Sequence, residues 1–550
     1  MSSLSPINWD WLLLPPEGMM AHRWAGTSSC TAGLLLPPEG MMVHPGLPAG
    51  WVEMVLAAML LMVAWAIWTP VRTGHPHNSS SLAHLPVIGP VVRKILIMPW
   101  LLLVLRIAAA AIFLLAIYAG LFGTPLPERN LATMLTWTIW WSGLVGSIFF
   151  VGSAWCAICP WNSLSTWLVR RRLWRRGSET ASLGLRVPRV LRSVWPALLM
   201  FLGLSWLELG FGVTVSPYAT ALLALLMVVL ATVSLAVFER KAFCRYFCPV
   251  GRTIGFYSEL SPVALRPIDP DICARCTTLE CYHGTADVEP CPTHLVMGRI
   301  RQNTYCISCD ACSRSCPSQN VAWRLRNAGD EIIEAVHPRW DEAWFILGLL
   351  ALTSFHGTTM LPTWERWMSA LARVIGDSGQ LLWSFSISMG VSLLIPVALF
   401  ALLALLTQQM IAAKTEYRRV FAALALSALP LAFVYHLSHN LGHLVRESGG
   451  MGQVILNPLG ADTQPLARAE IHARHMLSMA HQDTIIFALQ AGLLLFGFWM
   501  AVRILRHRIT RVLPQGQAAT GLQILPVLAF IMAITMYNLW LLMQPMMMRM

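Results

Sequence analysis

The segment ALLALLMVVLATVSLAVFERKAFCRYFCPVG, residues 221–251, decides the fold because a long apolar run leads directly into a pair of cysteines. Such a run is long enough to cross a hydrocarbon core about 30 Å thick. Three charged residues end it at 239–241, and Cys244 and Cys248 follow, the second directly before Pro249. We therefore expect a transmembrane helix whose end carries a pair of redox-active or metal-binding thiols.

The composition extends this expectation to the whole chain. The chain is 56% hydrophobic and 12% charged, whereas a soluble domain carries about 25% charged residues. Apolar runs of membrane length recur at 51–69, 95–123, 132–153, 194–212, 219–238, 343–361, 380–406, 420–436, 484–502 and 521–543. We therefore predict an all-α polytopic membrane protein with about ten transmembrane helices.

The arginines and lysines between these runs predict an orientation. They gather between the first and second runs, the third and fourth, the seventh and eighth, and the ninth and tenth. Ten crossings bring these four segments to one face, which the positive-inside rule makes cytoplasmic. We expect a multi-pass protein of a bacterial-type plasma membrane with both termini outside. The net charge of +12 then reflects topology, so we expect membrane lipid and no nucleic acid as a partner.

The longest polar segment, 239–342, lies on the cytoplasmic side in this topology and contains ten of the thirteen cysteines. A reducing compartment disfavours disulfides, which makes metal ligation the better explanation. The chain thus divides into an outer tail (1–50), a five-helix membrane half (51–238), a cytoplasmic iron–sulfur domain (239–342) and a second five-helix half (343–550).

The stretch CISCDACSRSCP, residues 306–317, is the most specific motif in this segment. Its spacing, C-x2-C-x2-C-x3-C-P, is that of bacterial ferredoxins, and it is made by Cys306, Cys309, Cys312 and Cys316. In such a run three thiolates bind one cluster and the fourth binds a second cluster. A structural zinc site is the alternative.

A partner set lies upstream at Cys273, Cys276, Cys281 and Cys291. In two-cluster ferredoxins the fourth cysteine of each run binds the other cluster. This rule predicts that the first three bind one [4Fe–4S] cluster with Cys316, and that Cys291 binds the other with Cys306, Cys309 and Cys312. The spacing is wider than in a standard ferredoxin, so a degenerate site or a different metal is the alternative.

A second cysteine pair, Cys156 and Cys159 in AWCAICPWNS, repeats the features of Cys244 and Cys248. Each pair follows an apolar run, ends in Cys-Pro, and falls on the predicted cytoplasmic face. Four thiolates at one membrane depth can supply one further redox centre. Independent thiol redox pairs, or cysteines without a ligand, are the alternatives.

The sequence CRYFCPVG at 244–251, the earlier Cys-Pro pair and the two-cluster segment together resemble the NosR/NapH/CcoG family of membrane-bound polyferredoxins. The similarity covers roughly residues 95–330. Cys244 and Cys248 match the family's C-x3-C-P motif, whereas Cys156 and Cys159 are one residue closer together. The resemblance implies an electron carrier associated with nitrous oxide reductase, periplasmic nitrate reductase or cytochrome oxidase assembly. Whether the chain is itself an oxidoreductase subunit of quinol-dehydrogenase type is not determined by the sequence.

Histidines gather at the predicted outer face. His436, His439 and His443 share one helix face by their spacing, and His472 and His475 precede the ninth run. Histidines at a membrane boundary are functional candidates that bind haem b, copper or zinc; hydrogen bonding to backbone and lipid is the alternative. The tail repeats LLLPPEGMM with a following histidine at 12–22 and 34–44, a Met/His pattern that suits Cu(I) or, more simply, a packed turn.

These features predict a membrane-bound iron–sulfur protein that links a cytoplasmic or quinol electron pool to a periplasmic redox protein or an outer metal centre. The alternative is an assembly or reduction factor for a copper or haem centre. A third hypothesis is a transporter whose clusters sense redox state. Transporters often have broken helices at corresponding positions of two related halves, and such pairs are not evident in the sequence.

Overall fold

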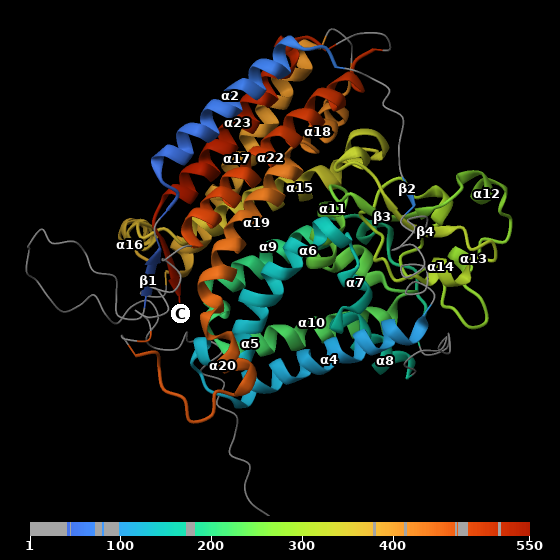
Figure 1. Ribbon diagram of the computed structural model, residues 1–550, viewed down its shortest axis with the longest axis horizontal. Helices are drawn as coiled ribbons and strands as arrows, with labels where there is room; N and C mark the ends of the chain where they lie inside the picture. Colours follow the sequence, from blue (N-terminus) through green and yellow to red (C-terminus); the bar gives the residue numbers. More distant parts are fainter. Residues whose placement is uncertain are drawn as a thin grey trace, which may run out of the picture.

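The computed structural model describes residues 41–44, 46–71, 80–81, 98–171, 182–377, 381–411, 415–467, 470, 482–514 and 519–549. The tail repeat, apart from its end at 41–44, lies outside these residues, as do His472 and His475. Figure 1 shows a bundle of long helices with a group of short elements on one side of it.

The long apolar helices correspond to the predicted runs. In chain order they are α2 (Ala49–Trp68), α4 (Pro99–Phe122), α5 (Leu131–Thr133) with η3 (Met134–Trp140) and α6 (Trp141–Val151), α9 (Trp195–Gly210), α10 (Pro217–Val237), α15 (Trp340–Thr359), α17 (Leu382–Met410), α18 (Tyr417–Ala425) with α19 (Ala428–Glu447), η10 (Ser448–Gly450) and α20 (Met451–Leu456), α22 (Gln482–Thr510) and α23 (Gly521–Met543). A shorter helix with charged residues, α16 (Trp364–Ile375), follows α15 and lies outside the predicted runs. Within the described ranges, eight spans are long and apolar enough to cross a membrane. The chain is thus mostly helical and compatible with a polytopic membrane protein.

Two predicted runs take a different form from a simple span. The sixth run forms α15, which meets α16 at an angle of 96°, and this pair makes a ninth span if it is counted as one. Pro362 lies in the break, where a proline cannot continue the helix. The fourth run forms α9, a helix of 16 residues that stops at Gly210, before Gly212 in the left-handed conformation.

The short elements lie mainly between α6 and α15. They are α7 (Trp155–Ile158), α8 (Pro160–Arg170), η5 (Arg189–Leu191), η6 (Val213–Val215), η7 (Phe243–Phe247), α11 (Pro249–Tyr257), β3 (Val263–Pro267), α12 (Pro270–Arg275), α13 (Glu280–His283), η8 (Met297–Arg299), α14 (Ala311–Ser315), β4 (Val321–Leu325) and η9 (Glu331–Ala335). Strand β4 pairs with β3 and with β2 (Ser80–Ser81), antiparallel in both cases. Elsewhere η2 (Pro127–Arg129) precedes α5, and β1 (Met41–His44) pairs with β5 (Met546–Arg549).

Arginines at the end of α22 attach the polar segment to the helix bundle. Arg503 forms an ion pair with Asp330 at 3.1 Å, and buried Arg508 donates to the carbonyls of Ile332 and Val336. Arg506 donates to Thr69 at the end of α2. The end of α22 therefore contacts both the polar segment and the end of α2.

The two ends of the molecule differ in character. Figure 1 shows α12, α13, α14 and the β3–β4 sheet together on one side, with α16 and β1 on the opposite side. The cysteine-rich segment and the bend between α15 and α16 thus lie at opposite ends of the bundle.

Candidate redox centres

The two Cys-Pro pairs meet at one cavity. Cys156, Cys159, Cys244 and Cys248 all line it, together with Trp155, Trp161 and Ile307. We call these four cysteines the membrane-edge group, because each pair follows the end of an apolar span, Leu131–Val151 or Pro217–Val237. The structure thus brings together two pairs that lie more than eighty residues apart in the sequence.

Equivalent local structures position the two pairs. After its apolar helix, each segment makes a short helical turn, α7 or η7, that carries the first cysteine. The second cysteine, Cys159 or Cys248, is the N-cap of a helix whose first residue is proline. The Gly251 N–H donates to Cys248 Sγ at 3.2 Å. Proline suits the first helical position, and the N-terminal amides stabilise negative charge on the thiolate.

Burial and mutual repulsion disfavour four free thiolates in this group. Burial raises the pKa of the Cys159 thiol to about 12. It also raises the pKa of Cys248, and the charges of Cys244 and Cys159 add to the effect while Arg252 opposes it. Thiolates that bind a metal are deprotonated outright. Without a metal these thiols would therefore stay largely protonated, whereas a metal bound among four soft sulfur ligands at one cavity would deprotonate them.

Two indoles in the same cavity support this fit. The Nε1–H groups of Trp155 and Trp161 are buried and have no hydrogen-bond partner within the described structure. A buried donor without a partner costs about 1–3 kcal/mol. Sulfur atoms held by the four cysteines would accept from such donors, so the residues present fit an iron–sulfur cluster.

A second cavity gathers the cysteines of the ferredoxin run. Cys291, Cys306, Cys309 and Cys312 line it, and Cys281 lies at the same cavity. We call the first four the middle group. In a two-cluster ferredoxin, cysteines at these positions of the motif bind a single cluster. Burial raises the pKa of Cys309 to about 12, so these thiols too would be largely protonated without a metal.

The other four cysteines of the described residues form what we call the distal group: Cys273, Cys276, Cys281 and Cys316. Asn320 joins two of them, because its side chain donates to Cys273 Sγ at 3.5 Å and its backbone N–H donates to Cys316 Sγ at 3.4 Å. Burial raises the pKa of Cys281, and the charges of Cys273 and Cys276 contribute further. Cys281 also contacts the apolar cluster on which Cys316 packs.

The three groups lie next to one another. Ile307 lines both the membrane-edge cavity and the middle cavity, and Ser153 bonds to Ser308 at 2.9 Å. Arg252, 1% exposed, donates to the carbonyls of Cys244 and Thr304. The positive charge of Lys241 lowers the pKa of both Cys159 and Cys309. Basic side chains therefore lie between the cysteine groups.

Single-ion sites are not evident in the described part of the chain. No set of three or more His, Cys, Asp or Glu side chains there is arranged to hold one metal ion. A four-iron cluster holds its four thiolates further apart than one ion does, because each sulfur binds a different corner of the cube. The three cysteine groups are therefore compatible with clusters.

The histidines of α19 do not act as one set. His436 accepts from Trp141 Nε1 at 3.0 Å and its Nδ1 bonds to the Tyr257 hydroxyl at 3.2 Å, which occupies both ring nitrogens. His443 bonds to Glu447 through Nδ1 at 2.7 Å and to His439 through Nε2 at 3.2 Å. The ring of His439 also contacts His356.

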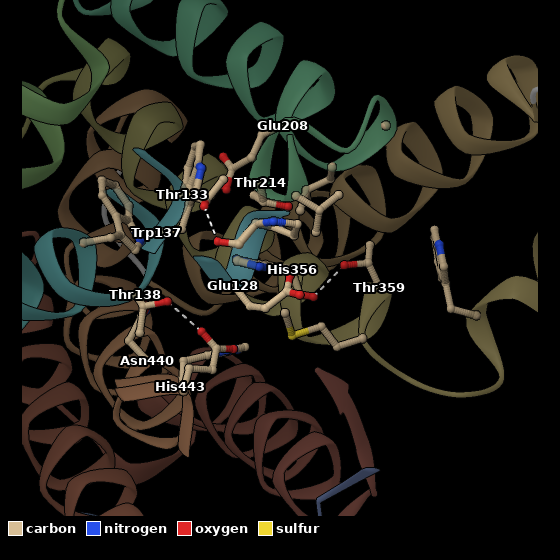
Figure 2. Close-up of a pocket in the computed structure, with 18 of the residues that line it drawn as sticks. Glu128, Thr133, Trp137, Thr138, Glu208, Thr214, His356, Thr359, Asn440 and His443 are labelled. Atoms are coloured by element: carbon tan, nitrogen blue, oxygen red, sulfur yellow. Dashed lines mark hydrogen bonds and ion pairs between the residues drawn. The ribbon is translucent and has the colours of Figure 1, made fainter. Parts of the chain in front are cut away.

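A larger cavity, about 180 Å³ in volume, lies where these histidines meet the other half of the bundle. Its lining comes from η2, α5, η3, α6, α9, η6, α15, α16, α17 and α19. Figure 2 shows Glu128, Glu208, His356 and His443 around it, with Thr138 bonded to Glu447 at 2.7 Å. We call it the interhelical cavity.

Three residues near the candidate sites, Asn320, Glu447 and Trp140, were not predicted from the sequence. Position in the motif could have drawn attention to Asn320, which follows the ferredoxin run by four residues. Glu447 lies one helical turn after His443, so the spacing could have indicated their pairing. The tryptophans carry no such signal, since aromatic residues are common in membrane helices.

Comparison with known proteins agrees with the membrane-edge group. A family model described as a 4Fe-4S binding domain matches residues 133–177 and 220–262. The two matched segments contain Cys156 with Cys159, and Cys244 with Cys248, so one unit occurs twice. No curated protein and no solved structure matches the chain.

Proposed function

We propose that this chain is a membrane-bound iron–sulfur electron-transfer protein. It would link a cytoplasmic or quinol electron pool to a periplasmic redox partner or metal centre. The observation that carries the proposal is the succession of three adjoining groups of four cysteines, from the membrane edge into the polar segment. Electron transfer needs redox sites in close succession, whereas a zinc-stabilised domain does not.

Each group would hold one [4Fe–4S] cluster. Cys156, Cys159, Cys244 and Cys248 would bind the first; Cys291, Cys306, Cys309 and Cys312 the second; and Cys273, Cys276, Cys281 and Cys316 the third. A bound cluster supplies one-electron redox chemistry at a potential set by hydrogen bonds, charge and exposure. Arg252, Lys241, Asn320 and the two indoles supply positive charge and donors to these sites.

The proposal includes the domain division into 1–50, 51–238, 239–342 and 343–550, with the polar segment on the cytoplasmic side. The arginine distribution supports this orientation. The contacts of Arg503, Arg506 and Arg508 support a common side for the positive loops and the polar segment.

Metal analysis of protein purified without oxygen tests the function. We expect about twelve iron and twelve acid-labile sulfide ions per chain, for three four-iron clusters. Dithionite should produce the electron paramagnetic resonance signals of reduced clusters. Zinc in place of iron and sulfide would refute the proposal. About eight iron atoms per chain would refute only the proposed membrane-edge cluster.

An alternative function is a reduction or assembly factor for a copper or haem centre. The contact of His356, His439 and His443 favours it, because His439 Nδ1 is buried without a partner in the described structure. Copper or haem bound at one per chain, and lost in His439→Ala, would favour this alternative.

A further inference from the structure

Helix α16 runs in a different direction from the helix before it. It has 12 residues and meets α15 at 96°. A helix of this length spans only about 18 Å, which is too short to cross a hydrocarbon core of about 30 Å. Figure 1 shows α16 at the end of the bundle opposite α12, α13 and α14. If α15 crosses the membrane, α16 therefore runs along its surface, at the leaflet away from the polar segment.

One flank of α16 packs against the bundle. Its buried residues, Trp364, Met368 and Ala372, recur every four positions and so share one face. The Trp364 ring lies 5.5 Å from that of Phe355 in α15 and 6.4 Å from that of Phe385 in α17, between centroids. Trp364 and Met368 also line the interhelical cavity. This packing forms one wall of the cavity and fixes the rotation of α16 about its own axis.

The end of α16 is attached to α17. The last helical residue is followed by Gly376, whose φ of 69° is left-handed. The carboxylate of Asp377 then accepts from the backbone N–H of Ser384 at 2.8 Å and from its hydroxyl at 2.7 Å. The helix is therefore held between two spans, α15 before it and α17 after it, and its remaining surface has a defined direction.

A second flank of α16 is apolar and exposed. Trp367, Leu371 and Val374 recur at i, i+4 and i+7, which places them on one face. Trp367 is 47% exposed and Val374 83% exposed, and Leu371 is half-buried. Tryptophan and aliphatic residues on one face are typical of helices that lie in the membrane interface. The exposed flank is thus suited to contact with lipid chains.

The third face of α16 carries positive charge. Arg366 and Arg373 lie seven residues apart, with Ser369 between them, so all three share a face. Both arginines are exposed. No acidic side chain in the part of the chain that the structure describes pairs with either of them. At about 3.6 residues per turn, this face is turned away from both apolar flanks. Two guanidinium groups are therefore available to an anionic group such as a phosphate.

Helix α17, to which α16 is attached, has an exposed apolar face of its own. Four exposed residues follow one side of this helix: Trp383, Ile387, Val391 and Leu394. Because α17 is long and apolar enough to cross a membrane, this side would contact lipid. Trp383 lies in the first turn, at the end of α17 that adjoins α16, and tryptophans are enriched at membrane interfaces. The surface beside α16 thus already fits lipid.

From these observations we propose that α16 is an interfacial helix, embedded in the lipid leaflet away from the polar segment. Trp367 and Val374 lie among the acyl chains. Arg366 and Arg373 bind the phosphates of phospholipid headgroups. The charge of the arginine face and the lipid-facing side of α17 identify lipid, rather than a protein, as the partner of this surface. The inference requires only that the bundle lies in a membrane, so it does not depend on the iron–sulfur function.

Contact with lipid is tested by photocrosslinking in native membranes. Photoreactive benzoylphenylalanine replaces Trp367 or Val374 in the full-length chain, and the adducts are identified by mass spectrometry. We expect phospholipid adducts at both positions, as at Ile387 in α17, and none at exposed Thr277 of the polar segment. Cross-links from α16 to another protein or to a second copy of this chain, without lipid adducts, would overturn the inference.

The surroundings of the exposed flank are tested by adding one charge. Val374→Asp should be harmless if this flank meets water, because the side chain is 83% exposed. A carboxylate is disfavoured in lipid, so in nanodiscs we expect the amide hydrogens of α16 to exchange at least about tenfold faster. The matched control is Ser369→Asp on the arginine face, which should exchange as wild type. Equal exchange in the two variants would overturn the inference, and photocrosslinking keeps it testable if Val374→Asp fails to fold.

Headgroup binding is tested by thermal unfolding of the full-length chain in detergent. Added phosphatidylglycerol should raise the unfolding temperature of wild type and of Arg275→Gln, a variant at an exposed position of the polar segment. The rise should be largely lost when Arg366→Gln and Arg373→Gln are combined. Inorganic phosphate at the same concentration should raise none of them. An undiminished response of the double variant to lipid would refute the headgroup contact, and an equal response of wild type to inorganic phosphate would indicate a free-anion site instead.

Discussion

Asn320 illustrates how single residues tune the candidate centres. Its side chain donates to Cys273 Sγ and to the Asp269 carbonyl, and its Oδ1 accepts from the Asp269 N–H. It therefore holds the start of α12 against the distal group. Hydrogen bonds to cluster sulfurs and nearby charge both set reduction potential.

We predict that Asn320→Asp makes the reduction potential of one cluster more negative. The variant loses an N–H donor to sulfur and gains a negative charge, and both changes disfavour the reduced state. A redox titration followed by electron paramagnetic resonance measures the effect. Asn327→Asp makes the same chemical change at an exposed position and should leave all potentials unchanged; equal shifts in both variants would contradict the assigned role.

The membrane-edge cysteines give a second prediction at this scale. Cys248→Ala and Cys159→Ala should each remove about four iron atoms and abolish electron transfer through the chain, while the other clusters persist. Because the four thiolates would serve one centre, the double variant should be no worse than either single one. Iron content and dithionite-reduced spectra measure this. Cys30→Ser is the control, and additive losses would instead indicate two independent thiol pairs.

At the scale of elements, α11 and the ferredoxin run approach very closely. A Cβ at Gly255 would lie 2.1 Å from the Thr304 carbonyl oxygen and 2.9 Å from its carbon. The same helix begins at the membrane-edge group and carries Arg252, whose guanidinium also reaches Thr304. One short helix thus sets the spacing between the membrane-edge and middle groups.

Gly255→Ala should therefore weaken the attachment of the ferredoxin run. Overpacking of this kind typically costs about 1–3 kcal/mol, and backbone atoms cannot move aside as a flexible side chain would. We expect faster loss of iron to a chelator, measured by the decay of cluster absorbance. Gly203→Ala in α9 has open space around its Cβ and should behave as wild type; equal decay in both would refute the close contact.

The whole molecule is predicted to have a fixed orientation in the membrane. Reporter fusions at Gly177 and at Ala328 should behave as cytoplasmic, and a fusion after Met550 as periplasmic, because four arginine-rich segments mark one face. This test also determines whether α9 and the α15–α16 pair each cross the membrane. A cytoplasmic C-terminal fusion would show an even number of crossings after Ala328 and would contradict the predicted outer position of the C-terminus.

The sequence alone determined the features that depend on local pattern. Hydrophobic length predicted the long helices, because a helix needs about twenty apolar residues to cross a bilayer. The spacing of Cys306, Cys309, Cys312 and Cys316 predicted a ferredoxin-type site, and the matched family model agrees with iron–sulfur binding at the two Cys-Pro pairs. The sequence did not predict the break between α15 and α16, where the structure has a bend of 96°.

Only the tertiary structure decided what lies between distant segments. The sharing of one cavity by Cys156, Cys159, Cys244 and Cys248 was a sequence hypothesis, and it depends on how α7, α8, η7 and α11 pack. The interhelical cavity arises from contacts between residues hundreds of positions apart, such as Thr138 with Glu447. Such contacts depend on side-chain packing between helices, and the apolar pattern that fixes each helix in the membrane is the same for many packings.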